Sequence, residues 1–142
     1  MLKFERLIVW QKALELTAQV HELTKKFPKD ELYILTAQIK RAADSVALNI
    51  AEGSTGQTDP EFRQFLGYAV RSAVEVVGCL HIGRKREMIN EKDFKRVYDQ
   101  TVEVLRMIHG LRNSLKLTTG FGLRTSDLRL RTKHAHRQVA TT

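Results

Sequence analysis

Cysteine, proline and long apolar runs are scarce in this chain of 142 residues. A single cysteine, Cys79, cannot form an internal disulfide, and no export signal is recognisable at the N-terminus, so we expect a cytoplasmic protein. No apolar run approaches the roughly 20 residues of a membrane-spanning helix, so we expect no membrane partner. The length favours one domain with its own core.

Strand signals are also missing, because no run alternates β-branched and polar residues between turn pairs. Apolar residues instead recur with the helical period in four segments, covering about residues 4–27, 29–52, 58–87 and 90–116. Helices of this length with short connections predict antiparallel neighbours. The sequence therefore predicts an all-α fold, an antiparallel up-down-up-down four-helix bundle over residues 1–116. In the second segment the expected core stripe is Leu32, Leu35, Ile39, Ala43, Val46 and Ile50.

Residues that favour helix ends support these boundaries. Gly53 fits the C′ position of the second helix, because glycine readily adopts the left-handed conformation that ends many helices. Pro60 fits the first turn of the third helix, with Thr58 or Asp59 as its N-cap. Asn90 fits the N-cap position of the fourth helix.

The helical period stops after Lys116, and residues 117–142 mix Gly, Thr, Arg and His without an apolar stripe. We expect a poorly ordered basic tail there. The tail carries about half of the net charge of +8. Its cations, all candidates for contact with nucleic acid, are Arg124, Arg129, Arg131, Lys133 and Arg137.

A second basic cluster is expected at one end of the bundle, where the third helix ends and the fourth begins. Such a cluster could bind phosphates with little base specificity. It could equally complement the C-terminal helix dipole and lie in solvent. Its members are Arg84, Lys85, Arg86, Lys92, Lys95 and Arg96.

The outward faces of the second and third helices differ from the charged surface that a solitary bundle would show. Apolar, small and polar residues are mixed there, and glycine in an exposed helix costs about 1 kcal/mol relative to alanine. We expect a subunit interface along these faces, with a partner for Glu52 such as Arg41 or an arginine of another helix; the alternative is an ordinary solvated face. The residues of this predicted interface and helix end are Arg41, Ser45, Asn49, Glu52, Gly53, Arg71 and Gly78.

Catalytic and metal-binding patterns are not found. The His21-Glu22 pair has Lys25 where a zinc protease needs its second histidine, and no histidine follows a glutamate at the spacing of a di-iron bundle. Cys79 has no base positioned beside it, since His81 points to a different helix face. We expect no enzyme activity, no cofactor and no metal site.

Three stretches resemble the four-helix-bundle proteins known as 23S rRNA-intervening sequence proteins. They are "FPKDELYILTAQIKRAADSVALNIAEGSTG", "EFRQFLGYAVRSAVEVVGCL" and "REMINEKDF". The resemblance covers about residues 1–116. The same pattern resembles the accessory variability determinant of diversity-generating retroelements, a pentameric barrel that binds reverse transcriptase and nucleic acid. The residues that carry it are Arg41, Ser45, Asn49, Ile50, Ala51, Glu52, Gly53, Ser72 and Glu75.

The resemblance implies a bacterial homo-oligomer, a pentamer, without catalytic activity. Two positions depart from the family pattern: Arg71 stands where the family commonly has glycine, and Gly78 where it has a larger polar residue. We therefore expect a homo-oligomeric bundle that binds RNA or DNA, or a nucleic-acid enzyme such as reverse transcriptase. The alternative is a structural or protein-interaction module of a mobile element that does not bind nucleic acid itself.

Overall fold

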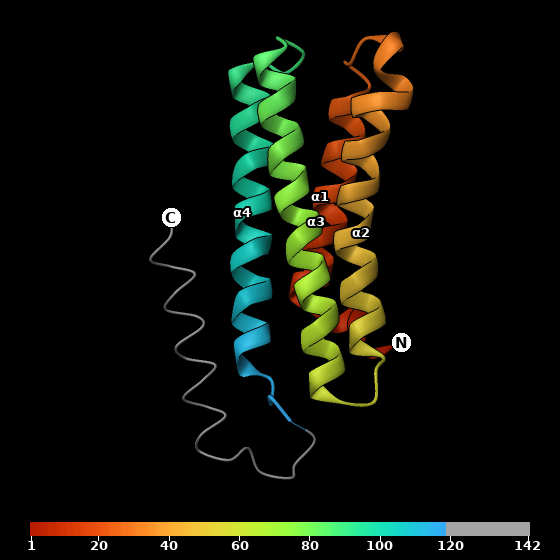
Figure 1. Ribbon diagram of the computed structural model, residues 1–142, viewed down its shortest axis with the longest axis vertical. Helices are drawn as coiled ribbons and strands as arrows, with labels where there is room; N and C mark the ends of the chain where they lie inside the picture. Colours follow the sequence, from red (N-terminus) through yellow and green to blue (C-terminus); the bar gives the residue numbers. More distant parts are fainter. Residues whose placement is uncertain (119–142) are drawn as a thin grey trace.

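The computed structural model describes residues 1–118, which fold into four long helices (Figure 1). The helices are α1 (Ile8–Thr24), α2 (Ala37–Ser54), α3 (Asp59–Lys85) and α4 (Glu91–Ser114). Consecutive helices run in opposite directions along the long axis of the molecule (Figure 1). The predicted all-α up-down-up-down bundle is therefore confirmed, and no strand occurs within residues 1–118. The predicted tail, apart from its first two residues, lies outside the described residues.

Short helices precede α1 and α2 where the sequence predicted continuous α-helix. Before α1, the 3-10 turn η1 (Lys3–Arg6) ends at Leu7, whose φ of −72° and ψ of 123° are extended. Pro28 is followed by the 3-10 turn η2 (Lys29–Glu31) and the π-helix η3 (Leu32–Thr36). The wider π turn moves side chains off the 3.6-residue period. Leu32, predicted in the core, is consequently 49% exposed.

Helices α3 and α4 begin as their capping residues predicted. The Thr58 hydroxyl accepts a hydrogen bond from the Glu61 N–H at 3.3 Å, and the Asn90 Oδ1 accepts one from the Asp93 N–H at 2.7 Å. Helix α3 ends at Lys85, slightly before the expected end, because Glu87 has a left-handed φ of 61°. The N-terminal ends of both helices could therefore be predicted from the sequence alone.

The core lies between the four helices and consists of one apolar stripe from each. Helix α3 packs against both α2 and α4, and α1 packs against the same two helices. Apart from Leu32, the stripe predicted for the second segment is buried. Fully buried side chains from the four helices include Leu16, Val20, Ile39, Val46, Ile50, Leu66, Val76, Leu80, Val97 and Ile108.

Helix α3 is also long and apolar enough to cross a membrane by length and composition alone. The sequence reading of apolar runs missed this property. Its cause is that apolar residues cover two faces of α3: Val76 and Leu80 are buried in the core, whereas Val74 and Ile82 are exposed. A core helix of a folded bundle passes the same test, and α3 packs between α2 and α4.

The end of the bundle where α3 meets α4 is joined to α1 through Asp93. This carboxylate is 4% exposed and accepts hydrogen bonds from Lys26 Nζ at 2.9 Å and Arg96 Nη1 at 2.7 Å. The hydrogen bonds from Lys26 and then Arg96 hold the pKa of Asp93 below its usual range. Asp93 therefore carries its charge at neutral pH and links the turn that follows α1 to α4.

Candidate functional site

The outward side of α2 and α3, here called the α2–α3 face, exposes large apolar side chains that the bundle does not cover. Leu48 is 62% and Val74 56% exposed, and Ile34 in η3 and Ile82 near the end of α3 are also exposed. The sequence predicted a mixture of apolar, small and polar residues on these outward faces. Tyr33, which the sequence reading did not single out, is 90% exposed because it lies in the π-helix.

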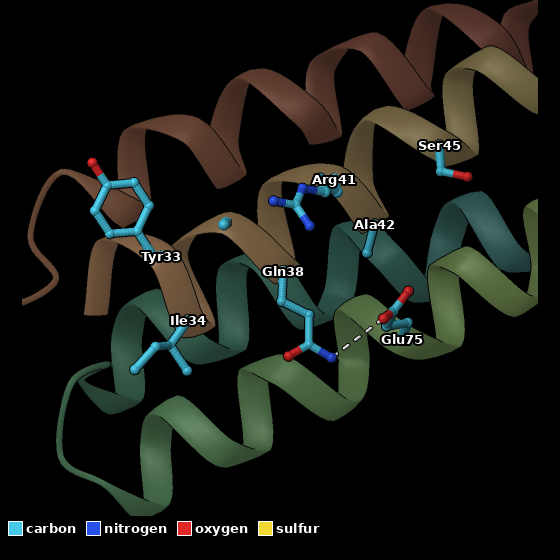
Figure 2. A pocket seen from close by; sticks show the side chains of 8 residues that line it. Tyr33, Ile34, Gln38, Arg41, Ala42, Ser45 and Glu75 are labelled. Atoms are coloured by element: carbon cyan, nitrogen blue, oxygen red, sulfur yellow. Dashed lines mark hydrogen bonds between the residues drawn. The ribbon is translucent and has the colours of Figure 1, made fainter. Parts of the chain in front are cut away.

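A shallow hollow opens on the α2–α3 face, and Figure 2 shows the side chains that line it. Gln38 Nε2 on α2 donates a hydrogen bond to Glu75 Oε1 on α3 at 3.3 Å. Arg41 lies one turn further along α2, and no hydrogen bond or ion pair joins its guanidinium to the residues that the structure describes. The hollow thus combines an exposed cation, a carboxylate and apolar walls from Tyr33 and Ile34.

Asn49 forms its hydrogen bonds within α2, whereas the sequence reading placed them across an interface or to the next loop. Its Nδ2 donates to Ser45 O at 2.8 Å and to Ser45 Oγ at 2.9 Å. The Ser45 and Ser72 hydroxyls share a hydrogen bond of 2.8 Å between α2 and α3. The three side chains, here called the Ser–Asn–Ser network, clamp α2 to α3.

Gly53 does not end α2, contrary to the sequence reading. The helix continues through Ser54, and Thr55 caps it with right-handed backbone angles. A Cβ on Gly53 would lie 2.6 Å from Phe65 Cβ and 2.9 Å from Phe62 Cδ2. Glycine is required at this position by the close approach of α3, and a helix-end glycine and a contact glycine look the same in sequence.

Glu52 is exposed, and its carboxylate has no partner in the part of the chain that the structure describes. The suggested pair with Arg41 is not formed within the chain. Glu52 lies eleven positions after Arg41, which places the two residues about 16 Å apart along α2. Two unpaired opposite charges therefore lie on the same side of the same helix.

The two positions that depart from the family pattern have different surroundings. Gly78 is exposed, and a Cβ built on it would meet nothing within 4 Å. Arg71 is exposed and lines a second hollow, here called the α3–α4 hollow. The other residues that line this hollow are Gln64, Gly67, Tyr68, Val70 and Arg112.

The predicted basic cluster is brought together at one end of the bundle, and carboxylates pair with most of it. Among the six cations of this cluster, only Lys85 and Lys92 have no ion pair within the described chain. Arg84 also lies over the Phe94 ring, 3.7 Å from its centroid. The pairs are Arg84 with Glu91, Arg86 with Glu31, Lys95 with Asp99, and Arg96 with Asp93. The tail cations Arg124, Arg129, Arg131, Lys133 and Arg137 lie outside the described residues.

Titratable groups elsewhere form no arrangement for nucleophilic or metal chemistry within residues 1–118. Burial, and then the Glu75 carboxylate, raise the pKa of the Cys79 thiol to about 11, so the thiol stays protonated at neutral pH. His21 Nε2 lies 3.2 Å from Asp44 Oδ1, which also accepts from the Thr17 hydroxyl. No group of three His, Cys, Asp or Glu side chains in the described segment could hold a metal ion.

Comparison with known proteins agrees with the fold. A solved structure of a protein of unknown function from the S23 ribosomal protein family of Bacteroides thetaiotaomicron has a TM-score of 0.68 and 19% sequence identity. The similarity covers 75% of this chain and 100% of that one. None of the curated proteins matches the chain. The family model of the 23S rRNA-intervening sequence proteins matches residues 5–110, which include all four helices except the last residues of α4. The chain therefore belongs to the 23S rRNA-intervening sequence protein family.

Proposed function

We propose that the protein is a non-enzymatic bundle that assembles with further copies of itself through the α2–α3 face. The assembly binds RNA or DNA, or an enzyme that acts on nucleic acid. The observation that carries the proposal is the row of exposed apolar side chains on this face. Several large apolar side chains exposed on one face are typical of an interaction site.

Charge complementarity supports a second copy of the chain as the occupant of this face. Arg41 and Glu52 both lack a partner within the described residues and lie on the same helix. When two copies face each other, Arg41 of one can pair with Glu52 of the other. Gly78 adds room, because the absence of a side chain lets another helix approach closely. The number of five copies rests on the family resemblance, and a ring of five needs a contact surface besides this reciprocal pairing.

A pair of leucine variants tests the interface. Leu48→Arg places a charge in the centre of the α2–α3 face, and Leu14→Arg makes the same change on α1, where Leu14 is 41% exposed. We expect Leu48→Arg to lower the sedimentation coefficient to that of a monomer and Leu14→Arg to leave it unchanged. If both variants sediment like the native chain, the α2–α3 face is not the interface.

Nucleic-acid binding is supported by the net charge of +8. Because most cations of the cluster at the end of the bundle are paired, we assign the contacts mainly to Lys85, Lys92 and the tail cations. Fluorescence anisotropy with short RNA and DNA should show binding at low salt that weakens as salt rises. No binding at low salt would remove this part of the proposal.

Loss of single charges tests the assignment within the cluster. Lys85→Gln should remove one phosphate contact, which reduces the magnitude of the slope of log affinity against log salt by about 1. Lys95→Gln is the matched control, since Lys95 Nζ is held by Asp99 at 2.7 Å. Equal slopes for both variants would contradict the assignment. The alternative, a protein-interaction module, predicts that partners co-purify after nuclease treatment while anisotropy stays unchanged.

A further inference from the structure

The α3–α4 hollow concentrates positive charge without a compensating acid. Arg71 on α3 and Arg112 on α4 both line it, and none of its other lining residues is a carboxylate. Unlike most arginines at the end of the bundle, Arg71 has no ion pair among residues 1–118. Two guanidinium groups in one hollow repel each other unless an anion lies between them or nearby.

Arg112, which lines this hollow, also has an unsatisfied donor. Its Nε is buried and has no hydrogen-bond partner within the described residues. An unpaired buried N–H costs free energy, so an orphaned donor of this kind needs an explanation such as a bound group. The Arg112 carbonyl oxygen accepts a hydrogen bond from Arg63 Nη1, which fixes the backbone that carries the side chain.

The remaining lining residues are arranged around the Arg112 guanidinium. Gly67 leaves the floor open, because a Cβ built there would lie 3.6 Å from Arg112 Nη2. Gln64 Nε2 donates to the Tyr68 hydroxyl at 2.7 Å, which leaves the hydroxyl proton of Tyr68 free to donate to another group. The Tyr68 ring packs edge-on against Phe65 at 5.7 Å, so its position is fixed.

We propose that the α3–α4 hollow is a binding site for a phosphate group, held by the guanidinium groups of Arg71 and Arg112 and by the Tyr68 hydroxyl. The planar guanidinium presents paired donors that match phosphate oxygens, and a phosphate can accept from both arginines at once. The group comes either from the backbone of a nucleic acid or from a small phosphate compound. Arg71 precedes Val74 by three residues on α3, so the site lies beside the α2–α3 face.

Nuclear magnetic resonance can follow the orphaned donor directly. Inorganic phosphate is titrated into the full chain at neutral pH, with sodium chloride at matched ionic strength as the reference, and the Arg112 Nε–Hε resonance is recorded. We expect a saturable shift with phosphate and none with chloride. A second titration uses short single-stranded RNA, and a third uses acetate.

The three titrations separate the sources of the phosphate. A shift of the Arg112 resonance with RNA at lower concentration than with inorganic phosphate assigns the site to a nucleic-acid backbone. A saturable shift with inorganic phosphate alone assigns it to a small phosphate compound. No saturable shift with either, or an equal response to acetate, overturns the proposal.

Variants test which residues form the site. Arg71→Gln should weaken phosphate binding about tenfold, as expected for the loss of one charge-assisted hydrogen bond. Arg106→Gln is the matched control, because it removes the same charge from an exposed position on another side of α4 and should leave phosphate binding unchanged. Equal weakening of phosphate binding by both variants would show that the effect comes from net charge alone, and it would contradict the proposed site.

A second variant keeps the test decisive if Arg71→Gln is poorly folded. Gly67→Glu adds a carboxylate beside Arg112, and the nearest atom to the new Cβ, at 3.6 Å, is at ordinary contact distance. We expect this variant to melt like the native chain and to lose the phosphate response. A retained response would contradict the site. A monomeric mass in solution would instead contradict only the proposed assembly.

Discussion

Gly53 and Gly78 show how the same residue type serves different purposes on neighbouring helices. Gly53 is buried and lies against Phe62 and Phe65, whereas Gly78 is exposed with open space around it. For a glycine in a helical pattern, the sequence alone cannot distinguish a helix end, a close contact and an exposed surface. The contacts of α3 with α2 decide the role of each.

Alanine at the two positions should have opposite effects on stability. Gly53→Ala forces Phe65 or the backbone to shift, and overpacking of this kind costs about 1–3 kcal/mol. Gly78→Ala should stabilise the separate chain by up to about 1 kcal/mol through helix propensity. Urea unfolding of both variants in a Leu48→Arg background measures these effects without assembly. Equal stability of Gly53→Ala and the parent would contradict the close contact.

Asp93 predicts a loss of stability in acid. Its pKa is lowered in the folded chain, first by the Lys26 hydrogen bond and then by that of Arg96, so the carboxylate stabilises the fold when it is ionised. This contribution is complete above the unfolded pKa of about 3.9 and is lost as the pH falls through the lower folded value.

Urea unfolding at about pH 5 and about pH 3 tests this assignment. Asp93→Asn should reduce the free energy of unfolding at the higher pH and show a smaller drop between the two values than the native chain. Asp99→Asn is the control, because its pair with Lys95 is exposed and contributes little. If both variants lose the same stability on acidification as the native chain, Asp93 does not link α1 to α4.

At the scale of the elements, the 3.6-residue period predicted the helices but not every turn within them. The core stripe of the second segment, apart from Leu32, and the N-caps Thr58 and Asn90 could be read from the sequence, because burial and capping depend on residue types at fixed spacing. The π-helix Leu32–Thr36 could not, since it depends on how the chain passes from Pro28 into α2. As a result Leu32 was placed in the core and Tyr33 was overlooked.

The candidate site was predicted less completely than the fold for a similar reason. Periodicity placed Ser45, Asn49 and Glu52 away from the core, which is where the structure has them. It gave no information on their partners, because hydrogen bonds between helices depend on the register of α2 against α3. The Arg71–Arg112 pair in the α3–α4 hollow was missed because its members are 41 positions apart in the sequence.

The Ser–Asn–Ser network predicts coupling between α2 and α3. Asn49→Ala should lower the free energy of unfolding by about 1 kcal/mol, as expected for a lost hydrogen bond between partly buried groups. Ser72→Ala should cost a similar amount, and the double variant should cost less than the two together, because both changes act on Ser45. Urea unfolding of the three variants measures the coupling. Strict additivity would show that the two residues act separately.

For the whole molecule, the bundle fold follows from four amphipathic segments, whereas assembly depends on the second apolar face of α2 and α3. Reversing charges tests how copies meet. Arg41→Glu and Glu52→Arg should each weaken association, because each places like charges opposite one another. The double variant restores opposite charges and should recover association in a sedimentation experiment. Failure of the double variant to recover would contradict an Arg41–Glu52 pair between copies.

The molar mass of the native chain in solution tests the central claim most directly. Light scattering at micromolar concentration should give a multiple of the chain mass of 16.3 kDa, fivefold if the family resemblance holds for the number of copies. Leu48→Arg measured beside it should give the mass of a single chain. A mass of 16.3 kDa for the native chain at every concentration would contradict the assignment of the α2–α3 face as a subunit interface.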